Sequence, residues 1–114
     1  MNEKLKKFFS ILLVELTEME DELNMLIDST EERFKSHEIT GYVWTENTAL
    51  LKRELNLIRL IHRKIGALRP ENYESIEEAK AAVLKVVNDQ HSVPQAVPQF
   101  IEKRVQKVAS YVET

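Results

Sequence analysis

The sequence predicts an all-α fold, with a long antiparallel helical hairpin plus two shorter helices that together form a four-helix-bundle-like domain. A heptad pattern of apolar residues begins close to the N-terminus, and such a pattern specifies helices that pack against one another. The 114 residues include only two Gly and three Pro, which leaves little material for strand turns or long loops. Hydrophobic residues make up 43% and charged residues 31%, a balance typical of a single globular domain over residues 1–114.

The first helix is expected over about residues 3–37, where the heptad pattern runs without interruption. Its apolar positions recur at alternating spacings of four and three, so they share one side of a helix. They are Leu5, Phe9, Leu12, Leu16, Met19, Leu23 and Leu26. Gly41 follows as a helix breaker, and we place the turn of the hairpin between Thr40 and Gly41.

The second helix is expected over residues 45–68, with Thr45 as its N-cap and Pro70 preventing its continuation. Its seam has the same alternating spacing and contains Trp44, Thr48, Leu51, Leu55, Ile58, His62 and Ile65. A second apolar stripe indicates that this helix is covered on two sides. That stripe contains Leu50, Leu57, Leu60, Ile61 and Leu68.

One antiparallel register pairs the two seams along their whole length. It places Leu16 opposite Ile65 and Leu26 opposite Leu55. We therefore expect residues 16–26 to belong to the core of the chain itself.

The same register explains an uneven distribution of charge. Residues 15–32 contain eight acids and no base, whereas residues 52–69 contain six bases and one acid. Glu20 and Arg59 flank the seam and are expected to pair. Because an exposed ion pair contributes only about 0.2–1 kcal/mol, the pattern specifies the orientation of the two helices more than it stabilises them.

Two shorter helices are expected over residues 75–90 and 98–112. Ser75 followed by Glu78 forms a capping box at the start of the first, and Pro98 suits the first turn of the second. The two helices could lie end to end as a broken third strut along the hairpin, or side by side in an up-down bundle. The sequence leaves both arrangements open.

Composition and charge limit the possible partners and location. The net charge of −3 argues against a nucleic-acid binder. The apolar run 8–14 is far shorter than the roughly 20 residues that span a membrane, so we expect no membrane segment. With no Cys in the chain, no disulfide framework requires an oxidising compartment, and we predict a cytoplasmic location.

The three histidines, His37, His62 and His91, are the obvious candidates for metal binding. In the expected register His37 lies at the turn and His62 at the opposite end of the hairpin. No His follows a Glu by three positions, the spacing that di-iron bundles use. We predict no metal site and no cofactor, and a metal- or ligand-binding bundle stays an alternative.

Catalytic motifs such as Gly-x-Ser-x-Gly and Ser-x-x-Lys do not occur, and two glycines cannot build a phosphate-binding loop. The helical nucleotide pyrophosphohydrolases are similar in size and class and carry paired Glu followed by Glu-x-x-Asp. Here Glu18 and Asp21 match one fragment and Glu31 and Glu32 form a pair, but the order is reversed and the second helix is basic. We therefore expect a non-enzymatic protein without catalytic residues.

Apolar side chains point in nearly every direction between residues 8 and 14, and a helix of this kind must be surrounded. Burial within the chain is one interpretation. The other is an interface with a protein partner or a second copy. The candidate interface residues are Phe8, Phe9, Ile11 and Val14, joined at the far end of the hairpin by Tyr42 and Trp44.

These patterns favour a protein that acts by protein–protein binding or homo-oligomerisation. In outline the chain resembles the small bacterial export chaperones of flagellar and secretion systems, which are acidic, Cys-free helical hairpin bundles of similar length without enzymatic motifs. The resemblance is one of overall pattern, covers no diagnostic motif and carries no residue across. It implies an export-chaperone-like helical hairpin as an alternative function.

Overall fold

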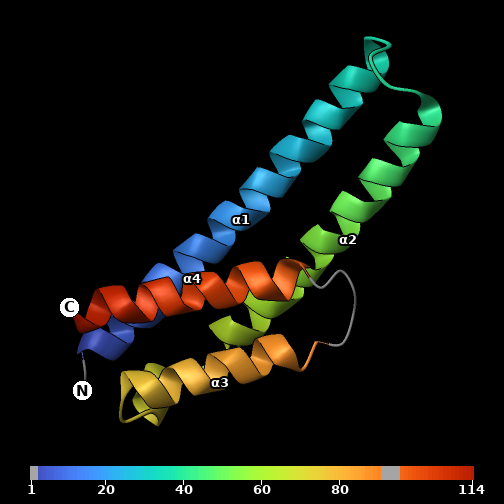
Figure 1. Ribbon diagram of the computed structural model, residues 1–114. Helices are drawn as coiled ribbons and strands as arrows, with labels where there is room; N and C mark the ends of the chain where they lie inside the picture. The colour runs from blue at the N-terminus through green and yellow to red at the C-terminus, as the bar shows by residue number, and fades with distance from the viewer. Residues whose placement is uncertain (1–2, 91–95) are drawn as a thin grey trace.

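The computed structural model describes residues 3–90 and 96–114. Within these ranges the chain forms four α-helices and one short 3-10 helix, and no strand. The elements are α1 (Glu3–Lys35), α2 (Gly41–Gly66), η1 (Pro70–Asn72), α3 (Ile76–Asn88) and α4 (Ala96–Glu113). The all-α class and the long hairpin are confirmed (Figure 1).

α1 and α2 pack along each other as the antiparallel hairpin that the seams predict. Leu16 and Ile65 are both fully buried, as expected for residues that face each other across the seam. The predicted ion pair is also present, with Arg59 Nε 3.5 Å from Glu20 Oε1. The hairpin sets the length of the molecule, which measures 55 Å along its longest axis and 25 and 20 Å along the others.

The turn of the hairpin is tighter than the sequence suggested. His37 has a φ of 64° and so adopts the left-handed conformation that ends α1. Thr40 caps α2, because its hydroxyl accepts a hydrogen bond from the Val43 N–H at 3.2 Å. The prediction that Thr45 caps this helix was wrong, and Gly41 is its first residue instead of a break between helices.

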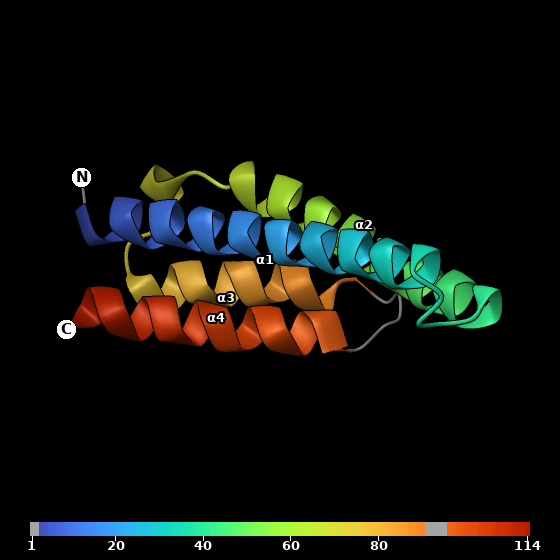
Figure 2. The ribbon, with the colours of Figure 1, turned by 90° about the horizontal axis from the view of Figure 1, so that it is seen from above.

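α3 and α4 lie side by side and form a second layer against the hairpin (Figure 2). α4 packs on α1 and α3 packs on α2. This settles the two arrangements that the sequence left open in favour of the side-by-side one. The second layer covers the half of the hairpin next to the chain termini and stops short of the turn (Figures 1 and 2).

The ends of the shorter helices follow local sequence chemistry. Ser75 caps α3 as predicted, accepting a hydrogen bond from the Glu78 N–H at 3.1 Å, while the Glu78 carboxylate accepts one from the Glu74 N–H at 3.3 Å. α4 begins at Ala96, two residues before the predicted start at Pro98. A helix tolerates proline anywhere in its first turn, where the missing N–H has no partner to lose.

The hydrophobic core lies where the two layers overlap. Among the described residues every buried residue of the core is apolar, and the hydroxyl of the half-buried Thr48 on α2 is a buried polar atom without a hydrogen-bond partner there. All four helices contribute to it, with Phe8 and Leu12 from α1, Ile58 and Ile61 from α2, Val83 and Val87 from α3, and Ile101 and Val105 from α4.

Truncation of Leu16, which is fully buried in this core, tests how much the packing contributes to stability. Leu16→Ala should lower the free energy of unfolding by about 2–5 kcal/mol, the range for truncation of a buried Leu. Chemical denaturation measures the change, and Met25→Ala is the matched control because Met25 is 70% exposed on the same helix. A loss below about 0.5 kcal/mol for Leu16→Ala would place this residue outside the core.

Candidate functional site

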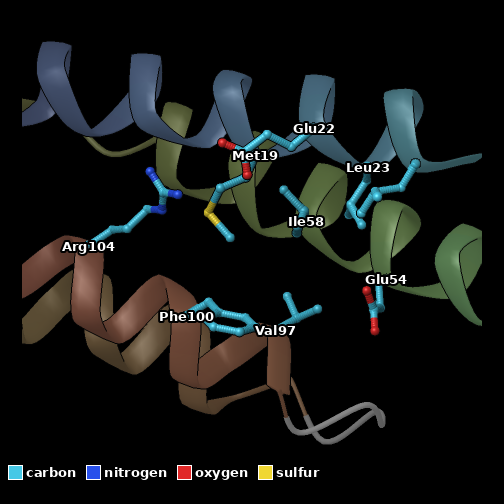
Figure 3. Close-up of a pocket in the computed structure, with 9 residues that line it drawn as sticks. Met19, Glu22, Leu23, Glu54, Ile58, Val97, Phe100 and Arg104 are labelled. Carbon is cyan, nitrogen blue, oxygen red and sulfur yellow. The ribbon is translucent and has the colours of Figure 1, made fainter. Parts of the chain in front are cut away.

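A pocket of about 260 Å³ opens where the second layer ends, between α1, α2 and the first turns of α4 (Figure 3). Val97 and Phe100 on α4 face Met19 and Ile58 across it. The full lining consists of Met19, Glu22, Leu23, Leu26, Glu54, Ile58, Val97, Phe100 and Arg104. We call this the arm-base pocket, because the hairpin continues from it past the second layer as an arm (Figure 2). We define the arm as residues 24–54, so that Leu26 and Glu54 of the pocket lining lie at its base.

The wall of the pocket is formed by the start of α4. Val97 is buried against the hairpin, whereas Phe100, three residues later, is 57% exposed. Arg104, one turn further along, pairs with Glu15 of α1. This ion pair links α4 to α1 beside the pocket. The Arg104 guanidinium, which lines the pocket, is therefore already paired with a carboxylate.

Along the arm, the side of the hairpin that α3 and α4 cover elsewhere is open. Leu26 follows the buried Met19 by two helical turns and is 52% exposed. On α2, Leu50 precedes the buried Leu57 by two turns and is 41% exposed, and Val43 continues the same stripe. We call Leu26, Val43 and Leu50 the arm face. Leu26 belongs both to the arm face and to the lining of the arm-base pocket.

The expectation that Leu26 belongs to the core is therefore wrong. Leu55, its expected opposite number, is buried, but Leu26 itself lies largely in solvent. The physical reason is that α4 starts at Ala96 and does not reach far enough to cover it.

Two carboxylates stand at the edges of the arm-base pocket, Glu22 on α1 and Glu54 on α2. Neither forms an ion pair with any part of the chain that the structure describes. Burial raises the pKa of the Glu54 carboxyl above its ordinary value of 4.5. The pocket thus combines an apolar lining with uncompensated negative charge.

A polar cluster on another side of the hairpin joins α1 to α2. Glu20 contacts Arg59 and also His62, whose Nδ1 lies 2.5 Å from Glu20 Oε2. His62 borders the core, as the sequence suggested, and is held by this carboxylate. His37 lies in the turn, and His91 falls outside the described residues. No group of three or more His, Cys, Asp or Glu comes together within 3–90 and 96–114 as metal ligands.

The predicted interface residues near the N-terminus divide into two groups. Phe8 and Phe9 are buried in the core, where their rings meet edge to face and Phe9 also contacts Tyr73. The chain itself therefore surrounds this part of α1. Ile11 is half-buried beside α4, and Val14 is 58% exposed.

The other two candidates lie near the turn. Tyr42 is 75% exposed. Trp44 stacks on Phe34, with ring centroids 4.7 Å apart, and this contact holds the end of the arm together. The structure thus does not bring the six predicted residues into one surface.

Sequence reasoning missed Leu26, Leu50, Phe100 and Glu54 as site residues. The periodicity of α1 places Leu26 in the seam, and nothing in that pattern tells where the second layer ends. The lengths of the helices contain the missing signal, because α3 and α4 are both much shorter than α1 and cannot cover the hairpin when they lie side by side.

In the part of the chain that the structure describes, no helix has the length and apolar character needed to cross a bilayer. Comparison with protein-family models, with curated proteins and with solved structures found no match. The fold and the site therefore define the molecule by geometry, as a helical bundle with an uncovered hairpin arm and an acidic, apolar pocket at the base of that arm.

Substitution of Glu54 tests whether burial in this pocket destabilises its ionised carboxylate. Because its folded-state pKa is raised, the folded protein binds the carboxyl proton more tightly than the unfolded chain, and ionisation destabilises the fold. Glu54→Gln should raise the free energy of unfolding at pH 7, and this gain should vanish as the pH falls below 4.5. Denaturation at several pH values measures it, with exposed Glu46→Gln as the control. A gain for Glu54→Gln that persists unchanged in acid would contradict the burial effect.

Proposed function

We propose that this protein is a non-enzymatic protein-binding module that receives a helix of its partner on the arm face and in the arm-base pocket. One observation carries the proposal. The side of the hairpin that packs on helices in one half of the molecule still carries the apolar residues Leu26, Leu50 and Val43 in a half where no helix of the described chain covers it.

The shape of the surface favours a helical occupant. In the covered half the same side of the hairpin already accommodates α3 and α4, so a further helix would continue an existing layer. A groove between two helices accepts a third through apolar side chains at positions i, i+3 or i+4, and i+7. The arm portion of α1, residues 24–35, is about 18 Å long at 1.5 Å per residue, which suits a helix of about twelve residues.

Self-association is a second candidate, supported by a different surface. Tyr111 is largely exposed and flanks the junction of α1 and α4 together with Ile11, and Val14, three residues after Ile11 on α1, is also largely exposed. Because Lys7 already lies over the Tyr111 ring at 5.0 Å from its centroid, we place the main binding surface on the arm. An export-chaperone-like role is one form that the proposed activity could take. The absence of Cys supports the proposal of a cytoplasmic location.

Selection from a display library of helical peptides tests the proposal without a known partner. The protein is the bait, and binders are counter-selected against the variant Leu26→Gln. This substitution removes the apolar side chain that the arm face and the pocket share. Met25→Gln is the matched control, because the neighbouring Met25 is 70% exposed but does not line the pocket.

We expect the selected peptides to carry apolar residues at helical spacing, to bind the control like the wild type and to shift amide NMR signals of the arm face. Both variants should fold with unchanged melting temperature, because exposed side chains contribute little to stability. Peptides that bind Leu26→Gln as well as the wild type, or a selection that enriches none, would reject the arm as a docking surface.

A further inference from the structure

The charges around the arm-base pocket differ from those on the rest of the hairpin. Glu22 and Glu54 flank the apolar lining from two different helices. Among the described residues that line the pocket, Arg104 is the one base, and it already pairs with Glu15. A ligand in the pocket therefore meets two free carboxylates and no free cation of the described chain.

The basic residues of the hairpin do not reach this pocket. Arg59 is bound to Glu20 on another side of the hairpin, and Arg33, nearer the turn, pairs with Glu38. Lys52 and Arg53 do not line the pocket. The α1 segment beside the pocket adds further negative charge, since residues 15–32 contain eight acids and no base.

The environment of Glu54 favours a ligand that carries a positive charge. The Glu54 carboxylate is partly desolvated, which raises its pKa, and within residues 3–90 and 96–114 no cation pairs with it to compensate for the lost water. A cation on a ligand would offset that desolvation and would find a second acceptor in Glu22 across the lining.

We infer that the partner segment is a basic amphipathic helix, whose apolar side chains enter the arm-base pocket and whose Lys or Arg side chains pair with Glu22 and Glu54. This inference rests on the proposed function and specifies the chemistry of its partner. Apolar contact supplies most of the affinity, and the two carboxylates select basic helices and reject acidic ones.

A second copy of the chain fits this surface less well. α3 and α4 block the base of each arm, so two arms can overlap face to face only in antiparallel orientation. A two-fold axis then places α1 of one copy against α1 of the other. That arrangement brings two acidic helices together, and like charges across an interface oppose association.

Two designed peptides of about fourteen residues test the inference. Both carry Leu at positions i, i+3 and i+7 and a side-chain staple on the opposite face that holds the helix, and they differ in carrying either Lys or Glu beside the Leu stripe. Fluorescence anisotropy gives the Kd of each for the full chain at low and at physiological salt. We expect the Lys peptide to bind about tenfold more tightly than the Glu peptide, the size expected for two exposed ion pairs, and expect this preference to shrink as salt increases.

The double variant Glu22→Gln, Glu54→Gln replaces both carboxylates by uncharged amides of nearly the same size. It should remove most of the preference for the Lys peptide and leave the apolar contribution to the affinity in place. Asp28→Asn is the matched control, because Asp28 is an exposed acid of α1 that does not line the pocket. This control should keep the full preference, which separates a local effect of the two carboxylates from the general acidity of α1.

Equal affinity of the two peptides for the wild type would overturn the basic-helix inference while leaving helix docking intact. Equal loss of preference in Asp28→Asn and in the double variant would also overturn it. Failure of both peptides to bind, in a protein that binds display-selected helices, would overturn it as well. Finally, sedimentation that shows a dimer broken by Leu26→Gln would assign the surface to a second copy instead.

Discussion

The structure depends on a mismatch of length between its two layers. α1 has 33 residues and α2 has 26, whereas α3 has 13 and α4 has 18. A helix rises about 1.5 Å per residue, so the two shorter helices, lying side by side, cover only part of the hairpin. The arm, its open apolar face and the pocket at its base all follow from this difference.

The two halves of the hairpin are consequently held by different forces. In the covered half, side chains from all four helices interdigitate and are removed from water, which is the main source of stability in a small domain. In the arm, past its first residues at the pocket, α1 and α2 are held mainly by each other among the described helices, through the narrow seam and the stacked rings of Phe34 and Trp44. Regions with few buried apolar contacts open more easily than the core, and binding surfaces are often found in them.

Much of the fold could be predicted from periodicity and caps. The seam register anticipated the burial of both Leu16 and Ile65 and the pairing of Glu20 with Arg59, because the spacing of apolar residues fixes which sides of two helices meet. Ser75 was identified correctly, because a capping residue acts on its immediate neighbours. The start of α2 was placed too late, since Thr40 and Thr45 are equally good caps by residue type and only the turn geometry at His37 decides between them.

The site was harder to predict, because a periodic pattern shows which face of a helix is apolar but not what covers that face. Leu12 and Leu26 both belong to the apolar seam in the sequence, yet Leu12 is fully buried in the core of all four helices and Leu26 is 52% exposed beyond the start of α4. Glu54 likewise acquires its raised pKa from partial burial at the pocket that the start of α4 forms with the hairpin. These are properties of the way the layers overlap, and they arise only when the helices are placed in space.

Native-state hydrogen exchange, followed by NMR residue by residue, tests the central claim that the second layer covers one half of the hairpin and leaves the arm open. The account predicts that amides of residues 24–35 and 41–54 exchange through openings of clearly lower free energy than those of residues 5–23 and 55–66. Equal protection along the whole length of α1 and α2 would contradict it, because it would mean that the arm is as well covered as the core.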